Sequence, residues 1–233
     1  MQSFCPNPDC ARPVDLLDLS QDKRKHFRGS CPHCHMPAAF RSPEALAAID
    51  REYQRKVSAG TLRGGPADEN HSPPLRVLVE DVRSLWNVGS IFRTADGAGF
   101  GTIYLCGITG SPPRKEIAKV SLGAEETVYW EYHPNPVTVL KELSGDGVQI
   151  VGLEVTGESL LLSQALSERL IETPLCLVLG NEVSGLSPQV IHYCHRICHL
   201  PMKGMKESLN VAVAFGIAAY ALSESYLKDA PVA

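Results

Sequence analysis

The pattern of hydrophobic and polar positions changes at Leu75. From there on, short apolar runs alternate with segments in which apolar residues recur at helical spacing. Continuous apolar runs indicate strands buried on both faces, and strands that alternate with helices predict a mainly parallel sheet covered on both sides. We therefore expect an α/β domain over residues 75–226 and a short tail at 227–233. The predicted strands are 76–80, 102–106, 148–155, 174–180 and 196–202, and the predicted helices are 88–98, 136–143, 188–193 and 209–223.

The chain before Leu75 has a different character. Residues 1–41 contain four cysteines and several prolines, which predicts a small separate module. Residues 42–74 are expected to connect this module to the domain. They begin with a polar helix over 43–59, which has a proline in its first turn and apolar residues at helical spacing: Leu46, Ile49, Tyr53 and Val57. The stretch GTLRGGPADENHSPP follows, and its glycine, proline and polar content predicts a flexible linker.

Four of the eight cysteines form two pairs near the N-terminus. Cys5-x4-Cys10 and Cys31-x2-Cys34 are separated by a polar stretch. Four thiolates brought together in this way satisfy tetrahedral zinc, and the metal supplies the folding energy that so short a segment lacks. We therefore predict a zinc-ribbon-like module with structural zinc on these four cysteines. The alternative is a flexible tail whose cysteines bind no metal.

Two further features of this module leave alternatives open. His33 or His35 is a weaker candidate ligand in place of one thiolate. The run KRKHFR, Lys23–Arg28, combines cations with one aromatic residue, which suits a phosphate backbone. A solvated loop explains the same run equally well.

A second group of cysteines and histidines lies near residue 196 and also suggests a metal site. Residues 196–202 are predicted to form a strand, in which neighbouring side chains point to opposite faces. Cys198 and His199 then face opposite ways, so the group is split between the two sides of the sheet. We therefore predict buried structural thiols here, for the group Cys194, His195, Cys198 and His199.

Composition and charge exclude some classes of protein. The formal net charge of −4 gives no overall basic footprint for nucleic acid, although local patches still steer ligands. The longest apolar run, Leu209–Leu222, is too short for a comfortable membrane span, and the first ten residues lack a signal-peptide pattern. We expect a cytoplasmic protein without a membrane segment, whose cysteines are thiols or metal ligands.

One helix candidate carries an arginine among small residues. In residues 87–99, an apolar arc holds Val88, Ile91, Phe92, Ala95 and Ala98, and a polar arc holds Asn87, Ser90, Arg93, Thr94 and Gly97. Asn87 is expected to cap the start of the helix, and a solvated Arg93 is the simplest interpretation. However, the helix follows a predicted strand, so it starts at the carboxyl edge of the sheet, where ligands bind in open α/β folds.

Two loops are predicted to reach the same edge. LVLGNEVSGL, residues 177–186, runs from a buried strand into glycines that let a ligand approach the backbone closely. LPMKGMKESLNVAVA, residues 200–214, leads from a strand into a long apolar helix, for which Ser208 is the expected N-cap. Asn210 lies at the head of this apolar helix and must find hydrogen-bond partners.

Together, these three segments resemble the ordered motifs of the SpoU branch of the SPOUT superfamily, which are RNA ribose 2′-O-methyltransferases. The resemblance covers about residues 75–222 and includes KVSLGAEETV, residues 119–128. It implies an α/β fold with a deep C-terminal trefoil knot, S-adenosylmethionine as cofactor, and a homodimer. The residues that the resemblance places at the cofactor are Gly180, Asn181, Gly185, Leu200, Met202 and Leu209.

The resemblance also implies a catalytic group. It places Arg93 at the reacting hydroxyl, where a guanidinium stabilises the developing alkoxide and holds an RNA phosphate. The residues expected to orient Arg93 and the substrate are Asn87, Glu182, Ser208 and Asn210. The candidate contacts to the backbone of a tRNA or rRNA are Arg114, Lys115, Lys119, Lys203 and Lys206.

Two other functions are compatible with this scaffold. One is a non-catalytic RNA-binding protein, which is disfavoured because the motif residues are present. The other is a methyltransferase for a base or a protein, which would need different acid–base groups.

Overall fold

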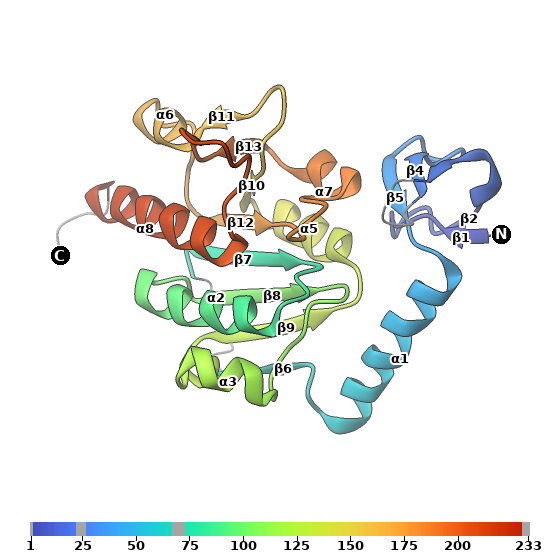
Figure 1. Ribbon diagram of the computed structural model, residues 1–233, viewed down its shortest axis with the longest axis horizontal. Coiled ribbons are helices and arrows are strands. Elements are labelled where there is room, and N and C mark those ends of the chain that lie inside the picture. Colours follow the sequence, from blue (N-terminus) through green and yellow to red (C-terminus); the bar gives the residue numbers. More distant parts are fainter. Residues whose placement is uncertain (1, 22–26, 67–72, 230–233) are drawn as a thin grey trace.

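A computed structural model describes residues 2–21, 27–66 and 73–229 (Figure 1). Its centre is an eight-stranded sheet in the order β11-β13-β10-β12-β7-β8-β9-β6. All neighbouring strands are parallel except β6 and β9, so the predicted α/β fold is confirmed. The strands are β6 Arg63–Gly64, β7 Leu75–Glu80, β8 Thr102–Cys106, β9 Tyr129–His133, β10 Gln149–Leu153, β11 Leu160–Leu161, β12 Leu175–Leu179 and β13 Arg196–His199.

Helices cover both faces of this sheet. Because neighbouring residues of a strand point to opposite faces, Val77 and Val79 join one apolar cluster and Leu78 joins the other. The first cluster packs against α2 Leu85–Ala98, α3 Lys115–Ser121, α4 Ala124–Thr127, α6 Leu162–Ser167 and α8 Val211–Asp229. The second packs against α5 Pro136–Gly145 and α7 Pro188–Tyr193. Burial on both faces explains why the central strands read as continuous apolar runs.

The N-terminal module consists of two small antiparallel sheets. β1 Gln2–Phe4 pairs with β2 Pro13–Asp15, and a 3₁₀ turn, η1 Leu16–Asp18, follows. The second sheet has the order β3-β4-β5, with β3 Ser20–Gln21, β4 Phe27–Ser30 and β5 Pro37–Phe40. The small core of the module also touches Tyr193 of α7, so the module packs against the larger domain. In the run KRKHFR, residues 23–26 lie outside the described residues.

The predicted helix over 43–59 is confirmed as α1 Pro43–Ala59. Ser42 caps its start by accepting a hydrogen bond from the Ala45 amide, and Gly60 ends it in the left-handed conformation with φ 65°. The buried face differs from the prediction at one position. Val57 is exposed, whereas the neighbouring Lys56 is 2% exposed, because Lys56 binds Ser111 and lies 4.8 Å from the centre of the Tyr132 ring.

Several elements differ from the prediction. The predicted linker contains β6, which pairs with β9, so its first residues are anchored to the sheet. β9 was not predicted because the prediction relied on continuous apolar runs, whereas in β9 only Trp130 and Tyr132 are buried and Glu131 lies between them. The last helix is α8 Val211–Asp229 rather than 209–223. Among the described residues, no helix is long and apolar enough to span a membrane. The deep knot stays a prediction.

Candidate active site

A cavity of about 250 Å³ lies where β10, β12 and β13 end and α8 begins. The carboxyl ends of parallel strands meet at this edge, which is where ligands bind in open α/β sheets. All six residues predicted to contact the cofactor line the cavity: Gly180, Asn181, Gly185, Leu200, Met202 and Leu209. Glu182 and Ser208 line it as well, whereas Asn87, Arg93 and Asn210 do not.

The loop after β12 is a tight turn held by its own backbone. Asn181 and Gly185 exchange two N–H···O bonds, of 3.1 and 2.9 Å, and the Asn181 side chain accepts from the amides of Val183 and Ser184. Glycine is required at both ends of the turn. A Cβ on Gly180 would overlap the backbone of Gly185, and Gly185 has a φ of +65°. The turn is therefore held by its own backbone and by the Asn181 side chain.

Glu182 links this turn to the start of α2. One carboxylate oxygen accepts hydrogen bonds from the Ser84 amide at 3.0 Å and from the Asn87 side chain at 3.1 Å. The other oxygen accepts from the Arg83 amide at 3.1 Å. Burial on its own would raise the pKa of Glu182, but these hydrogen bonds outweigh it and lower the pKa. Glu182 is therefore an anionic anchor at the positive end of the helix.

Asn210 extends the same chain of hydrogen bonds. Its side-chain amide donates to the Asn87 side-chain oxygen at 3.1 Å. Its own oxygen accepts from the amides of Ala212 and Val213, so Asn210 caps α8. Glu182, Asn87 and Asn210 thus join three distant segments, as the resemblance implies.

Two predicted helix caps are wrong. α8 begins two residues later than predicted, so its cap is Asn210 rather than Ser208. α2 begins at Leu85, and Ser84 caps it by accepting a hydrogen bond from the Asn87 amide. Asn87 therefore lies in the first turn of α2. Its side chain is free to bind Glu182 and Asn210.

Arg93 lies further along α2 and is exposed. In an ideal helix, six residues advance about 9 Å and turn the side chain by about 120°, so Arg93 and Asn87 point in different directions. Within the described part of the chain, Arg93 makes no hydrogen bond or ion pair. The apolar arc was predicted correctly, since all five of its residues are buried. Asn87 and Arg93 lie at opposite ends of the predicted polar arc, of which no residue is buried.

Sequence reasoning missed two carboxylates of the cavity, Glu154 and Glu207. Glu154 follows β10 and lines the cavity, and its carboxylate accepts from the Leu186 amide at 2.8 Å and the Val155 amide at 2.9 Å. His199, at the end of β13, also lines the cavity and binds Ser159 at 3.0 Å. A carboxylate that closes a buried strand was the available signal for Glu154, but the prediction placed it inside the strand.

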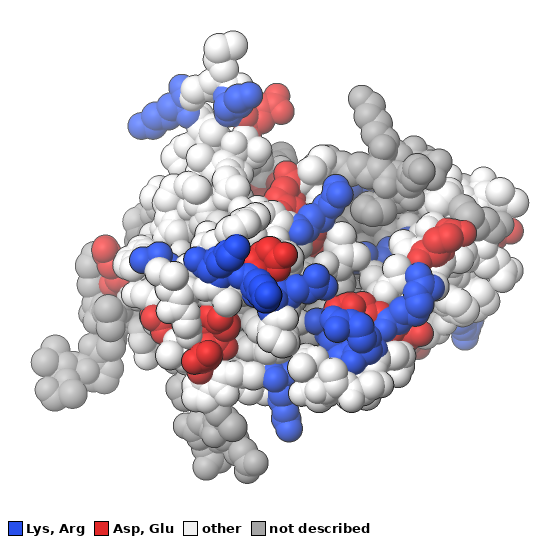
Figure 2. Space-filling view, turned by 60° about the horizontal axis from the view of Figure 1, so that its bottom comes forward, with Lys and Arg blue, Asp and Glu red and all other residues white. Residues whose placement is uncertain are grey.

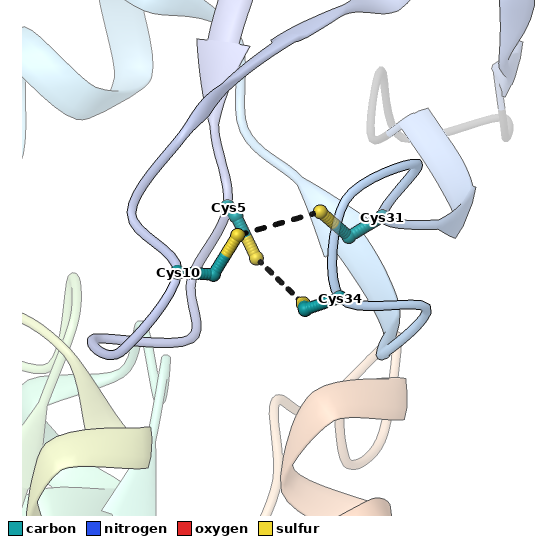
Figure 3. A group of neighbouring side chains, drawn as sticks. All are labelled: Cys5, Cys10, Cys31 and Cys34. Atoms are coloured by element: carbon teal, nitrogen blue, oxygen red, sulfur yellow. Dashed lines mark hydrogen bonds between the residues drawn. The ribbon is translucent and has the colours of Figure 1, made fainter.

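The four N-terminal cysteines converge on one point (Figure 3). Their sulfur atoms all lie within 4.8 Å of one another, with 3.6 Å between Cys5 and Cys34 and 3.8 Å between Cys10 and Cys31. A tetrahedral zinc with Zn–S bonds of about 2.3 Å needs sulfurs about 3.8 Å apart, so the four thiols fit this metal. Burial raises the pKa of Cys5. At Cys31 burial acts the same way, but hydrogen bonds from the Cys34 and His33 amides outweigh it and lower the pKa to about 7.

The other candidate ligands do not form a metal site. Among the described residues, the four cysteines are the only group of at least three potential ligands that lie close enough together. His33 binds the Pro13 carbonyl instead, at 3.1 Å. Cys198 is fully buried and the Cys194 thiol binds the Val190 carbonyl, as expected for structural thiols.

Comparison with known proteins agrees with this geometry. Residues 74–220 match the model of the SpoU rRNA methylase family. A tRNA (guanosine(18)-2′-O)-methyltransferase of Aquifex aeolicus is 32% identical over 65% of this chain and 70% of its own length. A 23S rRNA (guanosine-2′-O-)-methyltransferase of Neisseria meningitidis serogroup B is 30% identical over 76% of this chain and 72% of its own length.

A solved structure extends the comparison to the fold. The S-adenosylmethionine-bound rRNA methyltransferase of Sinorhizobium meliloti has a TM-score of 0.59 and 27% identity, over 69% of this chain and 59% of that one. The matched family and the α/β fold are those that the motifs predicted. The chain belongs to the SpoU rRNA methylase family.

Proposed function

We propose that this chain transfers a methyl group from S-adenosylmethionine to a ribose 2′-hydroxyl of tRNA or rRNA. The observation that carries the proposal is the hydrogen-bonded chain Glu182–Asn87–Asn210, which ties the arginine-bearing helix to the walls of the cavity. Two relatives named as guanosine 2′-O-methyltransferases support the reaction type, and the cofactor-bound relative supports the cofactor. The class of RNA stays open, because one of these relatives is named for tRNA and the other for 23S rRNA.

The cavity suits S-adenosylmethionine in its chemistry. Leu200, Met202 and Leu209 provide apolar surface for an adenine ring, and the backbone of the tight turn provides polar groups at close approach. Glu154 and Glu182 place carboxylates in the wall, which favours a cationic ligand. When bound, the cofactor supplies a reactive methyl group on a cationic sulfur. The residues of the chain then orient the two reactants and exclude water.

Arg93 supplies the positive charge that the ribose needs. A guanidinium is a poor proton acceptor, so Arg93 acts by holding an RNA phosphate and stabilising the alkoxide that develops on the 2′-oxygen. Its exposure and lack of partners in the described chain leave all its N–H groups available for RNA. Asn87, Ser208 and Asn210 orient the helix start and the substrate around it.

A band of cations supports RNA binding. Figure 2 shows Lys and Arg side chains spread across the face on which α1 and α3 lie, with Asp and Glu interspersed. Arg114, Lys115 and Lys119 are exposed at and along α3, and Lys203 and Lys206 are exposed in the loop before α8. Such side chains bind a phosphate backbone without reading its sequence.

The module is proposed to hold structural zinc on Cys5, Cys10, Cys31 and Cys34. The spacing of the sulfur atoms and the small core of the module support this assignment. Zinc content by elemental analysis tests it, and one zinc per chain is expected. Cys31→Ser should abolish that zinc, whereas Cys194→Ser should retain it.

The proposed assembly is a homodimer. Val213, Ile217 and Tyr220 lie exposed along α8, and Trp86 lies exposed at the start of α2. Exposed apolar side chains grouped on adjacent helices are typical of an interface, and a second copy fits the family resemblance. Light scattering should give twice the chain mass, and Ile217→Glu should halve it.

The cytoplasm is the proposed compartment. tRNA and rRNA substrates are found there, and its reducing conditions keep the cysteines available as zinc ligands. Fractionation of cells that express the tagged chain should recover it with the cytoplasmic fraction. Recovery with membranes or outside the cell would contradict the assignment.

Methyl transfer from labelled S-adenosylmethionine into separate tRNA and rRNA pools tests the reaction. The pools should come from cells that lack the gene, and Arg93→Ala should be compared with Arg196→Ala, which changes an exposed arginine at the opposite, amino end of β13. Ribose label that is lost only in Arg93→Ala is the expected result. Base label would place the reaction elsewhere, and cofactor binding without label in any pool would favour a non-catalytic RNA-binding protein.

A further inference from the structure

The zinc module contacts the domain at two points near the cofactor turn, residues 180–185. The first is in α7, the helix that follows the turn, where the Ala39 amide of β5 donates to the buried side-chain oxygen of Gln189 at 2.9 Å. The second is Asp81, the residue that follows β7, which forms an ion pair of 2.6 Å with Arg41. Figure 1 shows the module lying beside α7.

Asp81 also contacts the cofactor turn. Its backbone carbonyl accepts a hydrogen bond of 2.7 Å from the side chain of Asn181. The oxygen of the same side chain holds the Val183 and Ser184 amides and so shapes the wall of the cavity. Two covalently linked groups of Asp81, its carboxylate and its carbonyl, therefore bind the module and the cofactor turn respectively.

The backbone at Asp81 needs this support. Asp81 has a φ of +56°, which is unfavourable for a residue with a Cβ. One carboxylate oxygen accepts from the Ile108 amide at 3.0 Å, and the other binds Arg41. Gly107 makes room for this arrangement, because a Cβ there would overlap the Asp81 carboxylate and press on Arg41. Removing Arg41 leaves one carboxylate oxygen of Asp81 without its ion-pair partner, at a residue whose backbone is already strained.

The ion pair between Arg41 and Asp81 is mostly buried, so it is expected to matter more than an ion pair on the surface. The side chains of Arg41 and Asp81 are 15% and 14% exposed. Exposed ion pairs contribute little, but breaking a mostly buried pair leaves a charge that neither water nor a partner satisfies. A second charged contact between the module and the domain, Lys141 with Asp9, differs because Asp9 is 72% exposed and Lys141 lies on α5.

We propose that Arg41 is a positioning residue for the cofactor turn, and that the zinc module supports the cofactor site through the path Arg41–Asp81–Asn181. The inference rests on the proposed function, in that the cavity must bind S-adenosylmethionine. Coupling is reciprocal at equilibrium, so cofactor binding also stabilises the docked module. The module then belongs to the catalytic unit in addition to any contact that it makes with RNA.

Calorimetric titration of S-adenosylmethionine into the full chain tests the proposal. Arg41→Ala is expected to weaken cofactor affinity by about tenfold, within the range usual for coupled sites. Arg41→Lys should restore part of the affinity, because it keeps the charge and loses the planar fork. Lys141→Ala is the matched control, since it breaks a module–domain ion pair away from the turn, and its affinity should equal that of the wild type.

Hydrogen exchange separates the possible outcomes without using activity. Faster exchange of the Val183 and Ser184 amides in ligand-free Arg41→Ala, but not in Lys141→Ala, is expected. If the wild type does not bind the cofactor, the proposed function fails, while the exchange result still tests the path. Wild-type affinity and wild-type exchange in Arg41→Ala would overturn the inference. If Arg41→Ala does not fold, Asp81→Asn weakens the same pair while keeping the carbonyl that binds Asn181.

Discussion

The N-terminal module, for which we propose structural zinc, and the catalytic domain hold their candidate binding sites by different means. The module has a small core in which Cys5 and Cys31 are themselves buried members. The domain builds its cavity on a sheet with apolar clusters on both faces, and hydrogen bonds within the chain hold the turn around Asn181. We therefore expect the module to need its metal in order to fold, and the domain to fold whether or not its cavity is occupied.

Removing zinc should give the largest difference between the two regions. Zinc binding to small cysteine modules contributes about 10–16 kcal/mol to their folding, so a chelator should unfold the module while the domain stays folded. Titration with a thiol reagent measures this outcome. The four module cysteines should become reactive, whereas Cys106 and Cys176, which are fully buried in the sheet, should stay protected. Equal exposure of all thiols would mean that the two regions unfold together.

Arg93→Ala should separate catalysis from cofactor binding within the domain. Because Arg93 is exposed and lies outside the cavity, the substitution should lower kcat by about 10²–10³-fold, a usual cost for losing one oxyanion donor. Cofactor affinity and the free energy of unfolding should not change. Steady-state kinetics and calorimetry on the same preparation measure both quantities. A parallel loss of cofactor affinity would indicate that Arg93 belongs to the cavity wall instead.

The boundary between the regions should respond to pH through Glu80. Burial raises its pKa to about 7, the Asp81 carboxylate acts in the same direction, and hydrogen bonds from Ser187 oppose both. Between the ordinary pKa of 4.5 and about 7, the folded protein holds a proton that the unfolded chain has released. The free energy of unfolding therefore falls as pH rises through this window, by about 3–4 kcal/mol at 1.36 kcal/mol per pKa unit.

Urea unfolding at several pH values checks this dependence. Glu80→Gln stays neutral at every pH, so the fall in unfolding free energy between about pH 4.5 and pH 7 should be smaller by about the same 3–4 kcal/mol. The same slope in the wild type and in the variant would show that Glu80 does not titrate in this range.

Asn210 should give the smallest effect on stability and a separable effect on function. Asn210→Ala removes the cap of α8 and should cost about 1 kcal/mol of unfolding free energy. Asn210→Asp keeps the capping oxygen but loses the N–H that binds Asn87, so stability should be retained while kcat falls. Denaturant unfolding and kinetics of the two variants measure the split. Full activity in Asn210→Asp would remove the Asn87 contact from the catalytic arrangement.

Local patterns predicted the elements better than their ends. The apolar arc of α2 was predicted residue by residue because helical periodicity depends only on neighbouring positions. The same periodicity does not mark where the helix begins, so Ser84 was missed as the cap of α2 and Asn210 as that of α8. The strands β6 and β11 were missed because two residues are too few to show the alternation of a strand.

The site depended on information that no local pattern contains. Glu182 and Asn87 are separated by 95 positions, and Asn210 and Asn87 by 123, so their contacts follow from the topology of the sheet. The motif resemblance brought these residues together, and all six residues that it placed at the cofactor line the cavity. It gave no signal for Arg41 and Asp81, because the module that contributes Arg41 lies outside the motifs.

Helix α1 imposes a constraint on chain length. Its 17 residues span about 25 Å, with the Arg41–Asp81 pair just before its start and the buried Lys56 near its end. One inserted residue would rotate everything after it by about 100°, and Lys56 would leave Ser111. Seven inserted residues would nearly restore the rotation, but they would lengthen the helix by about 10 Å and separate the pair. Helical phase and length are therefore both fixed, and α1 tolerates neither a short insertion nor a long one.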